Sequence, residues 1–304
     1  IGTPVEQTQL HVKGEERRID LVIGTQPSGQ GHETSFAQVA AEWLGLPVAD
    51  VNVIVGDTDI VKIGGGSHSG RSMRMAGTVI VKASDILIEK GKRLAEIVLE
   101  ASVADIEFSD GAFRVSGTDY SVDLYTLDRE SRTRADLPED LAGGLSVIES
   151  NEMHTPVFPN GCHICEVEID EDTGVVEISR YAAVDDVGRA INPLIVDGQT
   201  HGGIVQGVGQ AMWEECVYDS DGQPLCGSFM DYGMPRADQF PFFVTELNEV
   251  PSPTNPLGVK AGGEGGTTPA PAVILNAVVH ALRPLGINDI KMPVTSLKVW
   301  RAMQ

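Results

Sequence analysis

The sequence predicts an α+β protein built from two related two-layer α/β units. A strand hairpin, a glycine loop that bears a glutamine, and a helix follow one another in the first half and again in the second half. Helical segments carry apolar residues at spacings of three and four, whereas strand segments alternate apolar and polar residues. The dinucleotide-binding motif GxGxxG is absent from the sequence, so a doubly wound sheet is not expected.

The first half opens with a predicted hairpin whose strands cover residues 8–12 and 18–25. A glycine loop over 24–31 follows, and a helix over 33–44 carries a single apolar stripe. A short strand is expected at 51–55, directly after this helix. These elements are the parts of one α/β layer pair.

A long helix is expected over 76–101, with Ile86 among the side chains that face the core. The segment 109–150 is richer in charge and less periodic, which is typical of a solvated surface insertion or a linker. We therefore predict a first unit over residues 1–150 with a charged insertion near 109–150, and a second unit over 151–304.

The second half repeats the plan with a hairpin over 165–184 and a loop that ends in Gln199, placed as Gln30 is in the first half. The next predicted helix, 201–216, contains several glycines, each of which costs about 1 kcal/mol relative to alanine. Close packing or close approach of a ligand must offset that cost. A last long helix is expected over 270–282, with a threonine cap and prolines in its first turn.

Composition restricts the classes of partner. The 304 residues carry a formal net charge of −22, which opposes binding to nucleic acid or to anionic membranes. No apolar run is long enough to cross a bilayer, and no signal peptide is visible. The chain does not begin with Met and is interpreted as a piece of something longer. We expect a cytoplasmic location.

The cysteines do not predict a metal site. Cys162 and Cys165 form a CxxC, but the sequence has no second CxxC and no spaced histidine pair. Strand alternation around Cys165 indicates a small core residue instead. No metal ligand is predicted, and reduced thiols suit the cytoplasm.

Two loops of the first half are candidate cofactor sites. Gln30, beside Gly31, offers amide donors and an acceptor. The loop that begins at Gly64 combines glycines, hydroxyls and an arginine before a helix, a composition typical of phosphate binding. We interpret His68 as a loop or cofactor-contacting residue rather than a metal ligand, and a surface charge remains the alternative for Arg71.

Glu264 lies alone among four glycines, directly before the helix expected at 270–282. The glycines leave its carboxylate unshielded and allow a ligand to approach the backbone closely. A helix N-terminus stabilises the anion, which suits a base that must stay ionised. The alternative is a solvated turn glutamate. Physical reasoning alone therefore predicts an anionic cofactor and a carboxylate base.

At these loops the chain resembles the molybdenum-binding subunit of the xanthine dehydrogenase, aldehyde oxidase and aerobic carbon monoxide dehydrogenase family, in its C-terminal portion. The matching segments are colinear and cover nearly the whole chain: 24–34, 55–59, 65–72, 186–193, 198–207, 231–235 and 255–266. One departure is the loop 66–72, where Ser69 and Gly70 exchange the usual order of serine and glycine.

The resemblance implies a molybdopterin-type molybdenum cofactor, in bacteria often its cytosine dinucleotide form, and a hydroxylase of aldehydes, heterocycles or carbon monoxide that uses water. Glu264 matches the glutamate that removes the proton of the attacking hydroxyl. The cofactor-binding residues expected from the loops and the resemblance are Gln30, Gly31, Ser67, His68, Ser69, Gly70, Arg71, Ser72, Gln199 and Gln206.

The resemblance also implies partners, namely the N-terminal half of the molybdenum domain, iron–sulfur and flavin (FAD) subunits or domains, and a dimeric assembly. The sequence itself shows no iron–sulfur cysteine pattern and no flavin motif. Two functions stay open: a catalytic component, or a non-catalytic half-module that binds cofactor and acts only with its N-terminal half. We expect the isolated chain to be inactive.

Overall fold

The computed structural model describes residues 3–304, which divide into two compact units. The first unit runs up to Val157 and also includes Pro251–Val259. The second unit consists of Phe158–Val250 together with Lys260–Gln304. Both units mix helices with small sheets, so the predicted α+β class is confirmed.

The main sheet of the first unit has the strand order β3-β2-β1-β7. Its strands are β1 (Val5–Lys13), β2 (Arg18–Ile23), β3 (Val51–Ile54) and β7 (Ser146–Glu152). β1 pairs antiparallel with β2 and with β7, while β2 and β3 are parallel. A parallel pair needs a crossover connection, and α1 (His32–Leu44) supplies it here. The elements predicted between residues 8 and 55 are therefore present.

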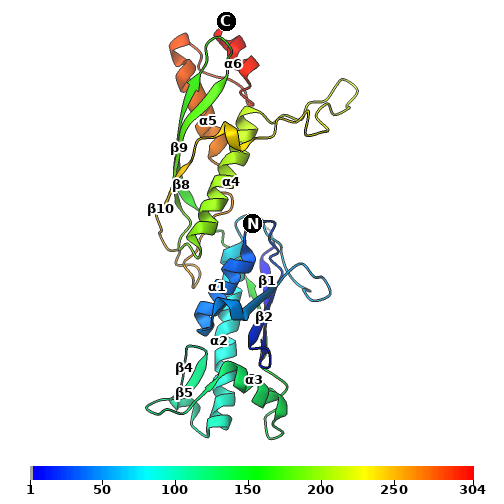
Figure 1. Ribbon diagram of the computed structural model, residues 1–304, viewed down its shortest axis with the longest axis vertical. Coiled ribbons are helices and arrows are strands. Elements are labelled where there is room, and N and C mark those ends of the chain that lie inside the picture. The colour runs from blue at the N-terminus through cyan, green and yellow to red at the C-terminus, as the bar shows by residue number, and fades with distance from the viewer. Residues whose placement is uncertain (1–2) are drawn as a thin grey trace. The chain divides into compact units, whose positions relative to one another are not determined.

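The long helix α2 (Ser72–Leu99) packs on α1 and on strands β1 and β7 (Figure 1). It begins four residues before the predicted start at 76. Leu87 is fully buried on its inner stripe, but Ile86 is 43% exposed, so the inward prediction for Ile86 is wrong. Each residue turns a helix by about 100°, and this step carries Ile86 off the stripe.

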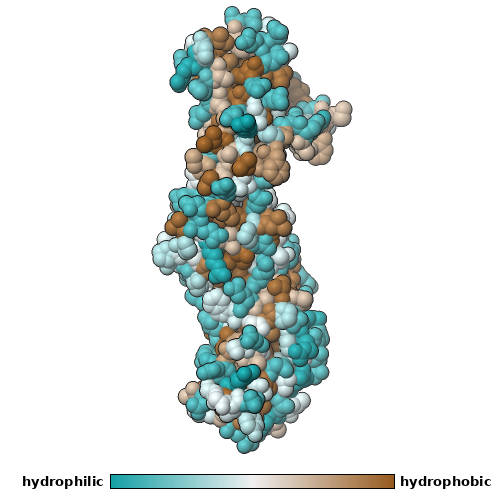
Figure 2. All heavy atoms as spheres, turned by 60° about the vertical axis from the view of Figure 1, so that its left-hand side comes forward, coloured by the Kyte–Doolittle hydropathy of each residue, from teal (hydrophilic) through white to brown (hydrophobic). Residues whose placement is uncertain are grey.

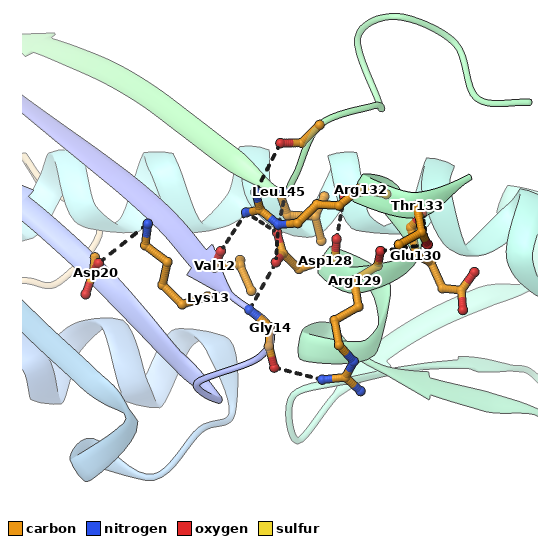
Figure 3. A network of polar contacts seen from close by, with 12 residues as sticks. Val12, Lys13, Gly14, Asp20, Asp128, Arg129, Glu130, Arg132, Thr133 and Leu145 are labelled. Carbon is orange, nitrogen blue, oxygen red and sulfur yellow. Dashed lines mark hydrogen bonds and ion pairs between the residues drawn. The ribbon is translucent and has the colours of Figure 1, made fainter. Parts of the chain in front are cut away.

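The charged segment after α2 is folded into the first unit. It contains a three-stranded sheet and one helix: β4 (Ile106–Ser109), β5 (Ala112–Val115), β6 (Ser121–Asp123) and α3 (Leu124–Thr133). Asp128 on α3 is 1% exposed and accepts hydrogen bonds from the backbone N–H groups of Gly14 and Leu145, at 3.0 and 2.8 Å (Figure 3). Arg132 neutralises the same carboxylate. Part of the charge that suggested solvation is therefore internal.

The second unit has a sheet of order β10-β9-β8. Its elements are β8 (Asn160–Ile169), β9 (Val176–Asp186), β10 (Val244–Leu247), α4 (Pro193–Met212), α5 (Ala270–Leu282) and α6 (Ser296–Met303). Buried apolar residues of these elements form one core, against which Cys165 packs. Burial, followed by the charge of Glu166, raises the pKa of the Cys165 thiol to about 12. The predicted core role of Cys165 agrees with this packing.

Two predictions about the helices of the second unit are wrong. Gln199 lies inside α4 rather than in a loop, because the helix begins at Pro193. The Asn192 side chain accepts a hydrogen bond from the Ile195 N–H at 3.1 Å and caps that start. The bounds of α5 agree with the prediction, but its N-cap is Pro269 and no side chain caps it.

Four short 3-10 turns complete the described elements, at Val48–Asp50, Val103–Asp105, Ala237–Gln239 and Arg283–Leu285. No helix within residues 3–304 is long and apolar enough to cross a membrane. Apolar and polar side chains are interspersed over the face shown in Figure 2.

Candidate functional site

The two glycine loops of the first unit lie directly against each other. A Cβ added to Gly24 would lie 2.2 Å from the Cα of Gly64, so only glycine permits this approach. The first loop leads into α1 and the second into α2, so the N-terminal ends of both helices are brought to the same region. The structure thus joins two segments that the sequence separates by about forty residues.

The buried side chain of Arg71 holds the two glycine loops in place through hydrogen bonds and an ion pair. Its guanidinium is fully buried and forms an ion pair with the equally buried Glu6 at 2.7 Å. It also donates to the carbonyl oxygens of Gly66 at 2.7 Å and Val5 at 3.1 Å. Thr25 of the first loop donates to the same Glu6 carboxylate at 2.8 Å. The surface-charge alternative for Arg71 is therefore wrong, and its predicted contact with a cofactor stays a prediction.

Positive charge is in excess beneath the second loop. Arg74 is 2% exposed and donates to the carbonyl of Thr155, and within residues 3–304 no carboxylate pairs with it. Burial, and then the neighbouring charge of Arg71, lower the pKa of Arg74. Of the two buried guanidinium groups, only that of Arg71 is paired with the buried carboxylate of Glu6. This imbalance favours an anion at the loop.

The N-terminal ends of α1 and α2 have no side-chain cap. Their N-cap residues are Gly31 and Arg71, and neither makes a capping side-chain hydrogen bond. The ring of His32 is buried, and its Nδ1 atom has no hydrogen-bond partner in the described part of the chain. Uncapped N–H groups at a helix start, together with the helix dipole, form a binding site for phosphate-like anions.

Glycines leave room above these helix ends. A Cβ added to Gly29 or to Gly66 would meet nothing within 4 Å. Both glycines have positive φ angles, 99° and 71°, and Ser69 and Gly70 also lie in the left-handed region, at 53° and 63°. The loop backbone is therefore shaped by residues that adopt this conformation and stays open to a ligand.

The polar side chains of the two loops are held by short-range hydrogen bonds. The Gln30 amide oxygen accepts from the Ser28 N–H. The hydroxyls of Ser67 and Ser72 lie 2.9 Å apart. The exposed His68 contacts the Ser69 hydroxyl and the Gly65 carbonyl. Within residues 3–304, no group of three or more His, Cys, Asp or Glu side chains could hold a metal ion.

In the second unit, Glu264 lies in the turn segment before α5. Its side chain is exposed and makes no hydrogen bond or ion pair within residues 3–304. The segment itself is fixed by packing against α4, since a Cβ on Gly266 would lie 2.3 Å from the Thr200 carbonyl oxygen. A free carboxylate on a fixed backbone is a suitable proton acceptor.

Two glutamines of α4 accompany Glu264. The Gln199 amide oxygen would lie 3.8 Å from a Cβ added to Gly263, the residue before Glu264. The Gln206 amide oxygen accepts from the Thr267 hydroxyl at 3.3 Å. The predicted site residues therefore form two groups. Gln30, Gly31 and the 67–72 loop belong to the first unit, while Gln199, Gln206 and Glu264 belong to the second.

Sequence reasoning missed a buried polar chain beside the Glu264 segment. His163 Nδ1 lies 2.9 Å from the Tyr181 hydroxyl, and its Nε2 lies 3.2 Å from Asp185 Oδ1. The other oxygen of Asp185 lies 4.0 Å from a Cβ added to Gly265. Burial raises the pKa of Tyr181. Because the Asp185 carboxylate only accepts, a neutral His163 ring carries its proton on Nε2, and its Nδ1 then accepts from the Tyr181 hydroxyl. The paired acids that end β9 were the available signal.

Asp186, the acid that follows Asp185 at the end of β9, binds Lys260, four residues before Glu264 in the sequence. Asp186 accepts from Lys260 Nζ at 2.5 Å and from the Gly188 and Val250 N–H groups. Burial works against ionisation, but the hydrogen bonds from Lys260 and from the backbone outweigh it and lower the pKa of Asp186. The Asp186–Lys260 pair anchors the irregular segment that leads from Lys260 to Glu264.

Comparison with known proteins places this geometry in a family. The family model described as a molybdopterin cofactor-binding domain matches residues 3–241. The chain is 38% identical over 293 residues to the 6-hydroxypseudooxynicotine dehydrogenase complex subunit gamma of Paenarthrobacter nicotinovorans, covering 94% of this chain and 36% of that protein. It is 34% identical to the carbon monoxide dehydrogenase large chain of Afipia carboxidovorans, covering 92% and 34%.

Solved structures are similar over almost the whole chain. The reconstituted CO dehydrogenase from Oligotropha carboxidovorans superposes with a TM-score of 0.88 at 32% identity, covering 97% of this chain and 37% of that one. Quinoline 2-oxidoreductase from Pseudomonas putida 86 gives a TM-score of 0.88 at 33% identity, covering 99% and 38%. The chain therefore spans little more than a third of the relatives that it matches. It belongs to the molybdopterin cofactor-binding domain family and resembles the C-terminal portion of the molybdenum-binding subunits of this group.

Proposed function

We propose that this chain is the cofactor-binding part of a molybdenum hydroxylase, which oxidises an aldehyde, an N-heterocycle or carbon monoxide with oxygen taken from water. The observation that carries the proposal is the pair of uncapped helix starts at the glycine loops of the first unit. Family membership supports a molybdopterin-type cofactor as the anion that they would receive. Partners with iron–sulfur and flavin centres, a dimeric assembly and a cytoplasmic location belong to the same proposal.

The residues of the first unit fit such a cofactor. Phosphate oxygens would accept from free N–H groups at the starts of α1 and α2, with the charge of Arg74 beneath them. Gln30 would offer its amide N–H donors, since its oxygen is already used by Ser28. The excess of buried cations and the orphaned His32 Nδ1 atom support an anionic ligand, in agreement with a dinucleotide form that adds phosphates.

When bound, the molybdenum cofactor supplies the two-electron oxidation and the transfer of a water-derived oxygen. Glu264 then acts as general base and takes up a proton on a carboxylate oxygen. Its exposure and lack of bound partners keep that oxygen available. Gln199 and Gln206 lie on the adjacent face of α4 and would orient the ligand through their amide groups.

The test is Glu264→Gln in the complete enzyme, which keeps the shape of the side chain and removes its basicity. We expect full cofactor content and a loss of turnover of about 10²–10⁴-fold, the usual contribution of a general base. The matched control is Glu171→Gln, at an exposed glutamate of the β8–β9 turn, which should leave turnover unchanged. Unaltered turnover in the Glu264 variant would contradict the assignment.

A second candidate is a non-catalytic half-module. It is favoured by the coverage, because relatives extend well beyond the region matched by this chain. On this reading the chain binds cofactor weakly or not at all until an N-terminal half completes the site. Molybdenum and pterin analysis of the purified chain decides between the two. Stoichiometric cofactor together with activity of the chain alone would exclude the half-module.

A further inference from the structure

A hairpin arm leaves the second unit after α4 and carries two of the four cysteines. It extends away from the helix in Figure 1, over residues 213–236. The turn is defined by an antiparallel bridge between Tyr218 and Pro224. The Leu225 N–H donates to the Val217 carbonyl at 2.8 Å, and the Asp219 N–H donates to the Gln223 carbonyl at 3.0 Å.

These bonds fix which residues stand opposite each other. Residue 217 faces 225 and residue 218 faces 224. Extending this antiparallel register by one further pair would set Cys216 opposite Cys226. Hydrogen-bonded and non-hydrogen-bonded pairs alternate along an antiparallel ladder. Because the Tyr218–Pro224 pair lies between two hydrogen bonds, it is of the non-hydrogen-bonded kind. In a ladder continued by two residues, the Cys216–Cys226 pair would be of the same kind.

That kind of pair suits a disulfide. The Cα atoms of a non-hydrogen-bonded pair lie about 4.5 Å apart, with their side chains close together on one face. A disulfide requires a Cα separation of roughly 4.4–6.8 Å. In the extended register the two cysteines would lie within the separation that a disulfide requires, and both are free thiols in this structure.

The base of the arm is held in this register by a second contact. The Tyr232 hydroxyl donates to the Glu214 carboxylate at 3.0 Å, which ties the segment after Cys226 to the segment before Cys216. That hydrogen bond raises the pKa of Tyr232, and the nearness of both Cys216 and Cys226 adds to the increase. Both thiols thus lie near one phenol.

The CxxC motif offers an internal contrast. Cys162 and Cys165 lie three residues apart on strand β8, so their side chains point to opposite faces. At about 3.3 Å per residue, their Cα atoms are about 10 Å apart, beyond the reach of a disulfide. The CxxC pair, Cys162 and Cys165, is therefore too far apart to form a disulfide. Cys216 and Cys226, ten residues apart in the sequence, are the better candidates.

We propose that Cys216 and Cys226 form a reversible, redox-sensitive disulfide that closes the base of the arm. The oxidant is a low-molecular-weight disulfide. One cysteine thiolate attacks it, forming a mixed disulfide and expelling one small thiolate. The second cysteine thiolate attacks the protein sulfur of that mixed disulfide and expels the other small thiolate. The protein loses two electrons and two protons, and the oxidant is reduced to two thiols.

The full 304-residue chain, first reduced, is incubated with glutathione disulfide, alkylated and digested for mass spectrometry. We expect a cross-linked peptide pair joining Cys216 to Cys226, lighter by two hydrogen atoms and restored by dithiothreitol. Chymotrypsin cleavage after the exposed Tyr218 should leave two fragments that separate on a gel only after reduction. Cys162 and Cys165 should stay alkylatable or carry glutathione singly.

Two single variants sharpen the result. Cys226→Ser should trap glutathione on Cys216, and Cys162→Ser should leave the cross-link intact. A bond between Cys162 and Cys165 would overturn the proposal. So would Cys216 and Cys226 that remain free, or that each keep a separate glutathione. None of these readouts needs cofactor or activity, so failure here is distinct from failure of the proposed function.

Discussion

Glycines serve opposite purposes in the two units. In the loops of the first unit, Gly29 and Gly66 border open space and have positive φ angles, so they provide access and a left-handed backbone. In the second unit, Gly203 and Gly207 of α4 press against Thr267 and Ala270, where any side chain would collide. These four glycines therefore leave open space at the loops of the first unit and permit close helix packing in the second.

The comparison extends to charge. Beneath the open loops, a fully buried ion pair holds the backbone and leaves a second arginine uncompensated. Beside Glu264, the backbone is held mainly by the contact of glycines with α4, and the carboxylate itself is left free. The Arg71–Glu6 ion pair is thus a polar scaffold beneath the proposed anion site. The glycine contacts with α4 are a packed scaffold beside the proposed base, Glu264.

The largest expected effect comes from breaking the polar scaffold. Arg71→Leu leaves the Glu6 carboxylate buried without its cation, and we expect a loss of about 3–5 kcal/mol in the free energy of unfolding. Urea unfolding measures it. The control is Arg93→Ala, which removes an ion pair of similar length, 2.8 Å, whose side chains are 54% and 58% exposed. That variant should lose less than about 1 kcal/mol. Equal losses would contradict the role given to Arg71.

The packed scaffold is tested by adding one methyl group. Gly266→Ala places a Cβ 2.3 Å from the Thr200 carbonyl, and we expect a loss of about 1–3 kcal/mol in the free energy of unfolding. Gly202→Ala, on α4 but with nothing within 4 Å of the new Cβ, is the matched control. It should gain about 0.5–1 kcal/mol, because alanine favours a helix over glycine. A destabilised Gly202 variant would show that α4 is constrained in a way these contacts do not explain.

The smallest effect is a pH dependence in the first unit. Burial lowers the pKa of His32, although the hydrogen bond with Thr25 and the charge of Glu33 oppose the shift. The unfolded chain therefore takes up the proton first as pH falls below about 6.5, the ordinary histidine value, and stability declines from there towards the folded pKa. Melting temperatures between pH 7.5 and 5.5 should fall more steeply for the natural chain than for His32→Gln. Parallel curves would contradict the assignment.

Local signals predicted much of the fold. The bounds of α5 follow from its proline-rich start and apolar content, and the hairpin and crossover of the first unit follow from alternation and helical spacing. The start of α4 was missed although Asn192 and Pro193, a cap and a first-turn proline, mark it in the sequence.

Hydrogen-bond and ion-pair partners that lie far apart in the sequence could not be predicted from such local signals. Asp128 looks solvated in a charged segment, and its burial depends on N–H donors more than a hundred residues away at Gly14 and seventeen away at Leu145. The burial of Arg71 and its ion pair with Glu6, 65 residues away in the sequence, were likewise not predicted. In both cases the pairing is decided by tertiary packing, which single-sequence patterns do not encode. The proposed Cys216–Cys226 disulfide is another pairing of this kind.

The contact between Gly24 and Gly64 has a consequence for recognising and altering this fold. Since each residue occupies the space that a side chain on the other would need, neither position can accept a substitution alone or together with the other. The two glycines act as a single two-part signature, about forty residues apart. A chain that retains one and lacks the other is not expected to bring its loops together, whatever the rest of its sequence resembles. Engineering that regrafts either loop must carry its partner glycine with it.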